Sequence, residues 1–408
     1  MKKKISVGSA VAIALIAAIL TFQITYVAVS GTAADLFSKS GNDGKSFMDR
    51  VTSRLSEVDS RYRELYVGEL DDDTLIDCVL KGYVAGTGDP YGAYYTADEY
   101  SSFLTDLSGE SVGIGVNVIY NTEVPGIEIV NVMPNSPAEA GGIDVGDVIV
   151  YVGESREKVS DLGFDGAVSA LRGDVGSDAV FSVLRDGEIT DFTLKRAKVE
   201  NVTVFPRVYG PDNTVGVIRI TGFEMSTPDQ FISAVTELLD DGCESLVFDL
   251  RYNPGGELNS IVKVLDYLLP EGPIIRVFDS NDTEVERFTS DASSLDCPMA
   301  VIVNSRTASA AELFTAALRD YDKAKIVGET TYGKGCMQST NPLPDGGALH
   351  VTYRMFKPPF SESYHGVGIV PDVTVTPNEK LSTLSIYKVD DADDNQLTAA
   401  VETIDGSK

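Results

Sequence analysis

Two residues of this sequence, Lys334 and Ser309, combine a side chain that could react with a backbone setting that could activate it. Lys334 stands between Gly333 and Gly335 in the stretch "GETTYGKG", and the nearest acidic residue in the sequence is Glu329. A lysine becomes a general base when burial and a lack of carboxylate partners lower its pKa by several units from about 10.4. The flanking glycines allow close backbone approach, so Lys334 is a candidate general base.

Ser309 is the nucleophile that such a base would serve. It follows the apolar run "MAVIVN" and the short turn "SRT", and a predicted helix starts at it. A helix N-terminus offers unpaired backbone N–H groups and a partial positive charge, which both stabilise a developing oxyanion. Ser309 and Glu312 also have the spacing of a capping box, in which the serine would only cap the helix.

A second loop could supply further N–H groups to such a site. The stretch "DLRYNPGG" follows a predicted buried strand, and Gly255 and Gly256 can present N–H groups without side-chain obstruction. Asn-Pro-Gly alone is a common turn sequence, so this loop supports a catalytic site only together with Lys334 and Ser309.

Several short patterns suggest other chemistry, but their context argues against them. "GETTYGKG" is one residue short of a phosphate-binding loop, because Gly335 replaces the Ser or Thr that would ligate Mg²⁺. Residues 109–113 match G-x-S-x-G before a predicted strand, where a helix is required, and residues 155–158 match S-x-x-K without companion motifs. A Ser-His-Asp triad would need His350 or His365, the two histidines of the chain. Neither lies beside an obvious nucleophile in the sequence, although the fold could still bring one close.

The elements that must position these residues alternate between strand and helix. From about residue 198 the predicted strands "VGVIRI", "SLVFDL", "MAVIVN" and "KIVGE" are separated by helical stretches such as "DQFISAVTELLDDG". This alternation predicts a layered α/β domain whose site lies at the strand ends. Residues 108–197 instead have short strands, turns and two short helices, which predicts a compact module, and residues 31–107 are mostly helical and polar.

Composition excludes some classes of partner. The 408 residues include 62 acidic and 33 basic side chains, for a formal charge of −29. This balance argues against a nucleic-acid-binding surface and against docking on anionic lipid head groups. The four cysteines lie far apart without C-x-x-C spacing, and two histidines cannot make a multi-histidine site, so no metal site is expected.

The first thirty residues predict export. Met1 and three lysines precede an uncharged run, residues 5–30, which is long enough to span a bilayer core of about 30 Å. Ala28–Ser30 would also be an acceptable cleavage site, so the segment is either an uncleaved membrane anchor or a signal peptide. In both cases the rest of the chain is expected to work outside the cytoplasm.

Taken together, residues 304–338, "NSRTASAAELFTAALRDYDKAKIVGETTYGKGCMQ", resemble the catalytic segment of the carboxyl-terminal processing peptidases, the S41 family of serine proteases. The resemblance implies that Ser309 is the nucleophile, Lys334 the general base and Gln338 the residue that orients the lysine. "DLRYNPGG" is similar to the family's D-L-R-x-N-P-G-G, and it implies an oxyanion hole formed by the N–H groups of Gly255 and Ala310. "GVGIVPD" at 366–372 resembles the family's closing motif.

The small module resembles a PDZ domain. "SVGIGVNV" is similar to the carboxylate-binding loop of these domains, and "NSPAEAGGIDVGDVIVYVGE" to their helix–strand segment. The resemblance implies that the N–H groups of Gly113, Ile114 and Gly115 hold the terminal carboxylate of a peptide. The peptide would then add as a strand along Val116–Ile119.

The expected fold is a layered α/β protease core of the crotonase/Clp-protease type with an inserted PDZ domain of mixed α+β structure and an N-terminal helical arm. The expected domains are an anchor or signal (1–30), the helical arm (31–107), the PDZ domain (108–197), the serine protease core (198–380) and a C-terminal tail (381–408).

The resemblance implies a serine endopeptidase of the bacterial cell membrane, or a secreted one if the signal is cleaved. Its PDZ domain would capture apolar or flexible C-terminal tails of protein substrates, without metal or cofactor, and the helical arm could pair two copies in a homodimer. Two alternatives remain open: a catalytically silent PDZ scaffold on the membrane, and a hydrolase that uses His365.

Overall fold

The structure is a computed structural model that describes residues 46–405 except 109, 122, 211 and 385. The chain forms two units, Met1–Cys78 and Val79–Lys408. The predicted anchor or signal, residues 1–30, lies outside the described residues. Among the helices that are described, none has the length and apolar character needed to cross a membrane.

The first unit contains helix α2 (Phe47–Leu65) and the start of α3 (Asp72–Ala85). A capping box starts α2: Asp49 N–H donates to Ser46 Oγ and Ser46 N–H donates to Asp49 Oδ2, both at 3.1 Å. Within the described part of this unit, α2 buries none of its side chains. Its exposed apolar residues are Phe47, Met48, Leu55, Val58, Tyr62 and Leu65. The helix therefore keeps an apolar surface that its own unit does not cover.

The small module, residues 110–200, forms a sheet in the order β3-β4-β5-β7-β8 with a separate β2–β9 pair. Ile127, Ile149 and Phe181 are at most 1% exposed in its core. The β7–β8 hairpin turns at Asp186 and Gly187, both with positive φ, as an Asp-Gly pair predicts. The element bounds are β2 Glu110–Gly113, β3 Val116–Asn121, β4 Gly126–Val132, α5 Pro137–Ala140, β5 Val148–Val152, β6 Glu157–Lys158, α6 Val159–Leu171, β7 Asp178–Arg185, β8 Glu188–Lys195 and β9 Ala197–Glu200.

The core is built on a six-stranded sheet in the order β10-β11-β12-β15-β16-β19. β10 is antiparallel to β11, and the other neighbours are parallel. The strands are β10 Val204–Tyr209, β11 Val215–Ile220, β12 Ser245–Asp249, β15 Met299–Val303, β16 Ala324–Gly328 and β19 Val373–Thr374. The parallel strands β11, β12 and β15 are fully buried, which explains their continuous apolar sequences.

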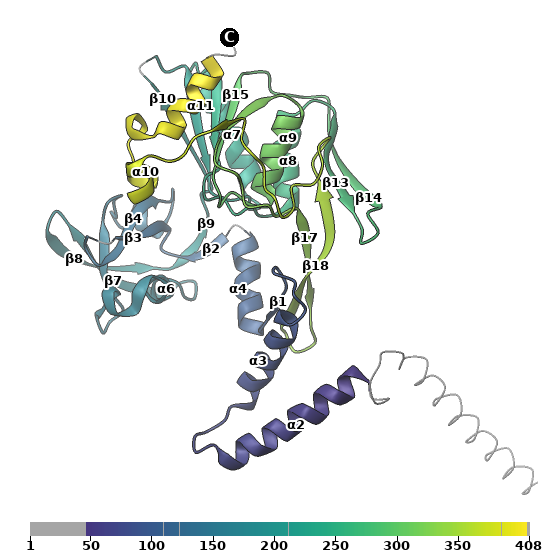
Figure 1. Ribbon diagram of the computed structural model, residues 1–408. Helices are drawn as coiled ribbons and strands as arrows, with labels where there is room; N and C mark the ends of the chain where they lie inside the picture. The colour runs from purple at the N-terminus through teal and green to yellow at the C-terminus, as the bar shows by residue number, and fades with distance from the viewer. Residues whose placement is uncertain (1–45, 109, 122, 211, 385, 406–408) are drawn as a thin grey trace, which may run out of the picture. The chain divides into compact units, whose positions relative to one another are not determined.

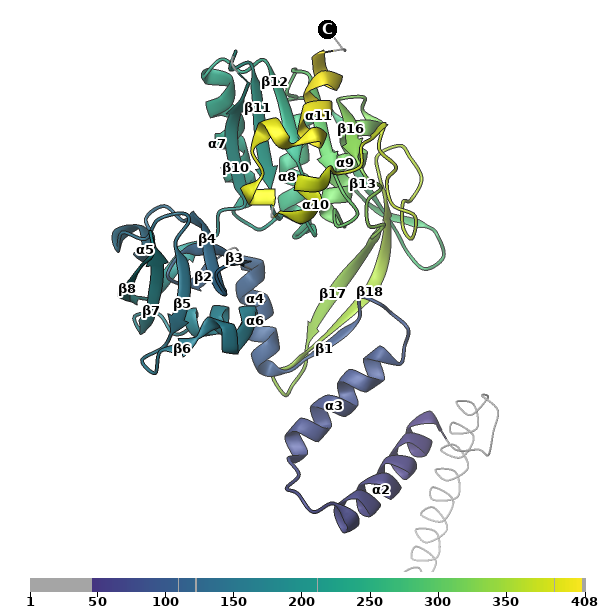
Figure 2. The ribbon, with the colours of Figure 1, turned by 60° about the vertical axis from the view of Figure 1, so that its left-hand side comes forward.

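Helices cover both faces of this sheet (Figure 2). Ile218, Phe248 and Val301 pack with α7 (Thr227–Asp240), α8 (Leu258–Leu268) and α9 (Ala310–Asp320). The alternate residues, including Val217 and Val247, pack with α11 (Asn395–Asp405) on the opposite face. This arrangement confirms the predicted layered α/β core. The C-terminal segment, expected as a tail, thus contributes a packed helix, after α10 (Glu379–Thr383), η1 (Ile386–Lys388) and η2 (Asp391–Asp393).

A second sheet joins the residues before the small module to the end of the core. It contains β1 (Ala93–Tyr95), β13 (Gly272–Phe278), β14 (Glu284–Ser290), β17 (Cys336–Pro342) and β18 (Ala348–Lys357). β17 and β18 form a long hairpin, and β1 lies beside β18 (Figures 1 and 2). The pairing of β1 with β18 is antiparallel, and Ala93 faces His350. α4 (Ala97–Ser108) then leads into the small module. The pairing of β1 places residues near 90 beside β17 and β18.

A buried ion network supports the loop after β12. The Asp249 carboxylate contacts the Arg219 and Arg251 guanidinium groups at 2.7 and 2.8 Å, and Arg251 also contacts Asp394 at 2.6 Å. Burial alone would raise the pKa of Asp249, but the two guanidinium groups outweigh it and hold this pKa far below its usual range. The network fixes the strand end from which the "RYNPGG" loop departs.

Replacing Asp249 with Asn is expected to lower the free energy of unfolding of the core by about 3–5 kcal/mol, because the buried Arg219 loses its carboxylate partner and Arg251 loses one of its two. Urea denaturation followed by circular dichroism at pH 7 measures this loss. Because the folded pKa is depressed, the stabilisation is complete above the unfolded carboxyl's pKa of about 3.9 and declines as the pH falls below it. Asp391→Asn, in the more exposed pair with Arg207, is the matched control and should cost at most about 1 kcal/mol. Equal losses in the two variants would contradict this account.

Candidate active site

Three loops that follow adjacent parallel strands carry the predicted catalytic residues. Gly255 follows β12, Ser309 follows β15 and Lys334 follows β16. Because these strands are parallel neighbours, their carboxyl ends meet at one edge of the sheet, where open α/β sheets bind ligands. The prediction that the site lies at strand ends therefore fits the topology.

Ser309 is held in an unusual backbone conformation at the start of α9. Its φ of 57° and ψ of −118° are sparsely populated for a residue with a side chain. Its N–H donates to Glu312 Oε2 at 2.9 Å, and its carbonyl oxygen accepts from the N–H groups of Glu312 and Leu313 and from Tyr364 Oη. The surrounding bonds thus fix a sharp turn at Ser309 where β15 gives way to the helix.

Glu312 connects the serine loop to the lysine loop. Its side chain is fully buried and accepts from Ser309 N–H at 2.9 Å, Thr331 Oγ1 at 2.6 Å, Gly333 N–H at 2.6 Å and Lys334 N–H at 2.7 Å. The spacing Ser309-x-x-Glu312 predicted a cap, and the bond from Ser309 N–H to Glu312 is one half of it. The sequence analysis did not predict the three hydrogen bonds to the lysine loop, because no local sequence pattern indicates contacts between such distant residues.

Gly255 lies directly against the start of α9. With φ of 98°, it occupies a region that favours glycine, and a Cβ atom there would lie 2.7 Å from Ala310 N and 2.8 Å from Ser309 Cβ. The structure therefore brings Gly255, Ser309 and Ala310 together. The Gly255 N–H donates to Asn253 Oδ1 at 2.8 Å, whereas the Ala310 N–H donates to no atom of the described residues. In this conformation, the N–H of Ala310 is available to an oxyanion and that of Gly255 is engaged.

The Lys334 side chain is half-buried, and the Tyr91 ring covers its amine. Nζ lies 4.7 Å from the ring centroid of Tyr91. Burial lowers the pKa of Lys334, while Cys336, Asp89 and Glu312 act in the opposite direction. Within the described part of the chain, Nζ forms no hydrogen bond or ion pair. A half-buried amine without a paired carboxylate is suited to act as a neutral base.

Gln338 lies on β17 and does not contact the amine of Lys334 through a hydrogen bond among the described residues. Its Nε2 donates to Thr352 Oγ1 at 3.2 Å and to Cys336 Sγ at 3.3 Å. The amide is therefore held by β18 and by the residue two positions before it.

Neither histidine is arranged as the base of a triad. His365 is exposed, and its Nδ1 accepts from Gly335 N–H at 3.2 Å, next to Lys334. His350 Nδ1 bonds Thr340 Oγ1 at 2.7 Å. In the described residues, no carboxylate forms an ion pair with either ring and neither ring bonds Ser309. Nor do those residues hold a cluster of three or more His, Cys, Asp or Glu that could bind a metal ion.

The predicted carboxylate-binding loop borders a groove of about 360 Å³. Gly113 pairs with Ala197 in the β2–β9 ladder, whereas the N–H groups of Ile114 and Gly115 donate to no atom of the described residues. Gly115 has a φ of 83°, and a Cβ there would lie 2.2 Å from Ser136 Cβ, so a side chain cannot be accommodated. Apolar residues of β3 and α6 line the groove: Val116, Val118, Phe164, Val168 and Leu171.

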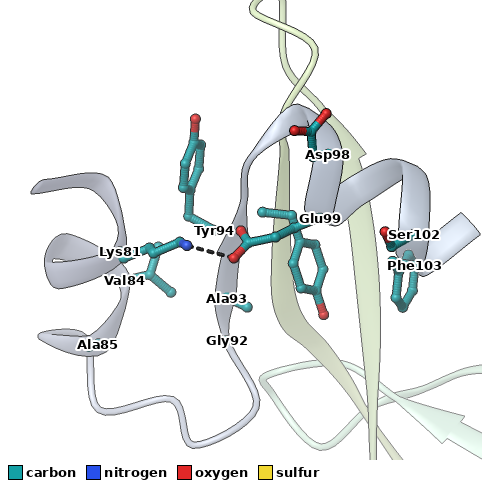
Figure 3. Close-up of a pocket in the computed structure, with 11 residues that line it drawn as sticks. Lys81, Val84, Ala85, Gly92, Ala93, Tyr94, Asp98, Glu99, Ser102 and Phe103 are labelled. Atoms are coloured by element: carbon teal, nitrogen blue, oxygen red, sulfur yellow. Dashed lines mark hydrogen bonds and ion pairs between the residues drawn. The ribbon is translucent and has the colours of Figure 1, made fainter. Parts of the chain in front are cut away.

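A separate cavity of about 790 Å³ lies between α3, β1 and α4 (Figure 3). The Lys81 amine and the Glu99 carboxylate form an ion pair of 2.6 Å across the segment that holds Gly92 and Ala93. None of the predicted catalytic residues lines this cavity, so its size does not mark the candidate active site.

Comparison with known proteins places both parts of the chain. Residues 214–375 match the model of peptidase family S41, and residues 112–195 match the PDZ domain model. A protein of Staphylococcus aureus (strain COL) named "Probable CtpA-like serine protease" is 33% identical over 396 residues, covering 94% of this chain and 78% of that protein. A protein of the same name from Staphylococcus saprophyticus is 32% identical over 403 residues, covering 95% and 79%. The crystal structure of a protein named "Putative S41 protease from Bacteroides fragilis NCTC 9343" superposes with a TM-score of 0.55 at 19% identity. The match covers 85% of this chain and 94% of that one, and it supports the fold alone.

Proposed function

The chain belongs to peptidase family S41, and from this premise we propose that it is a serine endopeptidase with Ser309 as nucleophile and Lys334 as general base. One observation carries the proposal: the buried Glu312 carboxylate binds the backbone N–H groups of both Ser309 and Lys334. It thereby joins a serine at a strained helix start to a half-buried lysine whose pKa burial lowers.

The reaction would proceed through an acyl-enzyme. Neutral Lys334 takes the proton of Ser309 Oγ, which attacks the scissile carbonyl, and the N–H of Ala310 stabilises the oxyanion. The Gly255 N–H would be the second donor to the oxyanion. To act so, it must either bond the oxyanion and Asn253 Oδ1 at the same time or give up its hydrogen bond to Asn253 Oδ1. Protonated Lys334 then donates to the leaving amine, and water releases the second product. Gln338 is proposed to orient Lys334, so the amine must move toward the amide or the amide toward the amine.

The PDZ groove is proposed to capture the C-terminal tail of a protein substrate. The N–H groups of Ile114 and Gly115 would receive the terminal carboxylate, and the apolar lining of β3 and α6 would hold the preceding side chains. Thr221 and Glu224 of the protease core also line this groove. Between them, Phe223 forms a parallel β-bridge with Gly256, in the loop that supplies the Gly255 N–H. This proximity supports delivery of the tail toward Ser309.

Converting the terminal carboxylate of a model substrate to a carboxamide is expected to raise KM about tenfold or more without changing kcat. Each charge-assisted hydrogen bond to a backbone N–H contributes about 1.5–3 kcal/mol, and 1.4 kcal/mol corresponds to a tenfold change in affinity. Steady-state kinetics with paired free-acid and amide substrates measures this difference. A short internal peptide that carries the cleavage site but no apolar tail is the control, and its KM should not respond to amidation. Equal KM values for both tailed substrates would contradict recognition of the carboxylate.

The proposals for location and assembly rest on features outside the active site. The basic start and the uncharged residues 5–30 support a catalytic part outside the cytoplasm, either tethered to the membrane or released by cleavage. The exposed apolar residues of α2 support pairing of two chains through the helical arm.

The alternative is a silent PDZ scaffold. It is favoured by two observations: the Gly255 N–H is engaged by Asn253, and Nζ of Lys334 has no hydrogen bond to Ser309 or Gln338 among the described residues. Incubation of the full chain with a protein that ends in an apolar, flexible tail separates the two functions. We expect new C-termini in the mass spectrum of the substrate, whereas the scaffold predicts binding without cleavage.

A further inference from the structure

The short segment Asp89–Tyr91, which precedes the PDZ domain in sequence, lies against the proposed catalytic lysine. The Tyr91 ring covers Lys334 Nζ at 4.7 Å, and the ring of His365 meets Tyr91 edge-on at 6.5 Å between centroids. The segment reaches this place because it lies between α3 and β1, and β1 pairs with β18. The protease core therefore receives part of its active site from the other side of the PDZ insertion.

Asp89 binds one residue of β18 through both of its carboxylate oxygens. Oδ2 accepts from the Thr352 N–H at 2.9 Å, and Oδ1 accepts from the Thr352 hydroxyl at 3.0 Å and from the Tyr91 N–H at 3.0 Å. Burial would raise the pKa of Asp89, but these hydrogen bonds outweigh it and lower that pKa. The carboxylate is thus an acceptor only, and the single proton of the Thr352 hydroxyl must point to it.

This proton direction determines how the Gln338 amide is oriented. Since the Thr352 hydroxyl donates to Asp89, it can only accept from Gln338, so the amide atom 3.2 Å away must be the donor Nε2. Nε2 also faces Cys336 Sγ at 3.3 Å. Oε1 accepts no hydrogen bond from the described residues and remains as the free acceptor. An ammonium group is a donor only, so Oε1 is the end of the amide that a lysine can use.

We propose that Asp89 is a positioning residue of the active site: through the Thr352 hydroxyl it fixes the Gln338 amide with its carbonyl oxygen available to Lys334, while Tyr91 covers the lysine amine. The inference rests on the proposed Ser309–Lys334 mechanism and extends it to a residue that touches neither the substrate nor the lysine amine. We refer to Asp89, Thr352 and Gln338 as the orienting relay.

Asp89→Asn should reverse this relay. The two Thr352 contacts go to different Asp89 oxygens, and asparagine keeps one oxygen only. With that oxygen at the Oδ2 position, where it accepts from the Thr352 N–H, the NH2 group takes the place of Oδ1 and donates to the Thr352 hydroxyl. The hydroxyl would then donate to Gln338, and the Gln338 amide would turn its carbonyl oxygen toward the hydroxyl. Its Nε2 would face Lys334, where two hydrogen-bond donors cannot bond each other. We expect kcat to fall about 10-fold to 100-fold, the loss that a small misplacement of a catalytic group can cause, with KM nearly unchanged.

The pH profile distinguishes positioning from general damage. The groups that face Lys334 are Asp89, Cys336, Glu312, His350 and the Tyr91–Tyr332 pair. The Asp89 carboxylate and the carbonyl oxygen of Gln338 both favour the charged form of the Lys334 amine. Removing the carboxylate or turning the amide away therefore lowers the pKa of Lys334 further. In Asp89→Asn, the acid limb of kcat should therefore move to lower pH even though its plateau falls. A variant that only loosens the fold would leave the limb in place.

The experiment uses the full-length protein and a tailed substrate, with kcat, KM and thermal melting measured for every variant. Thr352→Val should lose activity like Asp89→Asn, whereas Thr352→Ser keeps the hydroxyl and should retain it. The Asp89→Asn/Thr352→Val double variant should be no slower than Thr352→Val alone, because the two residues act in series. Asp345→Asn is the matched control. Asp345 lies in the turn of the β17–β18 hairpin and accepts hydrogen bonds from Gly347 N–H and from Tyr94 Oη of β1. It is not among the groups that face Lys334, so its replacement should leave kcat and the acid limb unchanged.

Three results would overturn the relay: Asp89→Asn with wild-type kcat and limb, multiplicative losses in the double variant, or a Thr352→Val enzyme as active as Thr352→Ser. If Asp89→Asn does not fold, the Thr352 pair decides alone. Failure of the relay is distinguishable from failure of the proposed function. If Ser309→Ala or Lys334→Ala remains active, the Ser-Lys mechanism is wrong, whereas if both are inactive and the relay variants behave as wild type, only the relay is wrong.

Discussion

Ser309→Ala is expected to lower kcat for cleavage of a tailed substrate by at least about 10⁴-fold, because no acyl-enzyme can form without the hydroxyl. The residual rate would come from binding and from the oxyanion donors alone. Substrate disappearance and new termini, followed by mass spectrometry, measure the loss. Tail binding through the PDZ groove, measured by fluorescence anisotropy, should persist.

Ser305→Ala provides the matched control for the nucleophile. Ser305 lies in the same loop, four residues before Ser309, and is exposed. Its replacement should leave kcat within about twofold, since exposed substitutions away from a site cost little. Activity that survives in Ser309→Ala, or that disappears in Ser305→Ala, would place the nucleophile elsewhere.

Lys334→Ala is expected to lower kcat by about 10²–10⁴-fold, the usual contribution of a positioned general base. Lys334→Arg should not restore activity, because a guanidinium cannot be deprotonated in a protein. Removing Lys334 leaves the Glu312 contacts intact, since Glu312 binds the backbone N–H of residue 334. Thermal melting of both variants should therefore stay close to that of the wild type.

Lys325→Ala is the corresponding control for the lysine. Lys325 lies on β16, just before the same loop, and its exposed amine pairs with Asp322 at 3.0 Å, a contact that raises its pKa. This lysine is charged at working pH and should be dispensable. A Lys334→Ala enzyme with wild-type kcat, or an inactive Lys325→Ala enzyme, would contradict the assignment of the base.

The placement of the candidate residues at one edge of the sheet could be predicted, because the loops that carry them follow parallel strands. Gly255, Ser309 and Lys334 each lie in the loop that follows an apolar strand, and parallel neighbours bring such loops to one edge. A glycine was expected at position 255 to expose its N–H group, and the positive φ and the closeness to Ala310 do exclude a side chain there.

The parts that could not be predicted depend on contacts between distant segments. Asp89 and Tyr91 reach Lys334 only through the antiparallel pairing of β1 with β18, and a three-residue strand has no reliable sequence pattern. Glu312 has the spacing of an ordinary helix cap, so its bonds to residues 331–334 were not visible. The polar, acidic C-terminal sequence likewise obscured the few apolar residues, Leu397, Ala400 and Ile404, by which α11 packs on the sheet.

The most direct test of the Ser309–Lys334 mechanism is the pH dependence of kcat/KM in the wild type and in His365→Ala, since this profile reports the base of the free enzyme. Lys334 acts when deprotonated, so the rate should rise with pH along a limb whose midpoint lies below that of an ordinary lysine, because burial lowers its pKa. His365→Ala should leave the position of this limb unchanged. A limb near pH 6.5, the ordinary pKa of histidine, that disappears in His365→Ala would show instead that the histidine is the base.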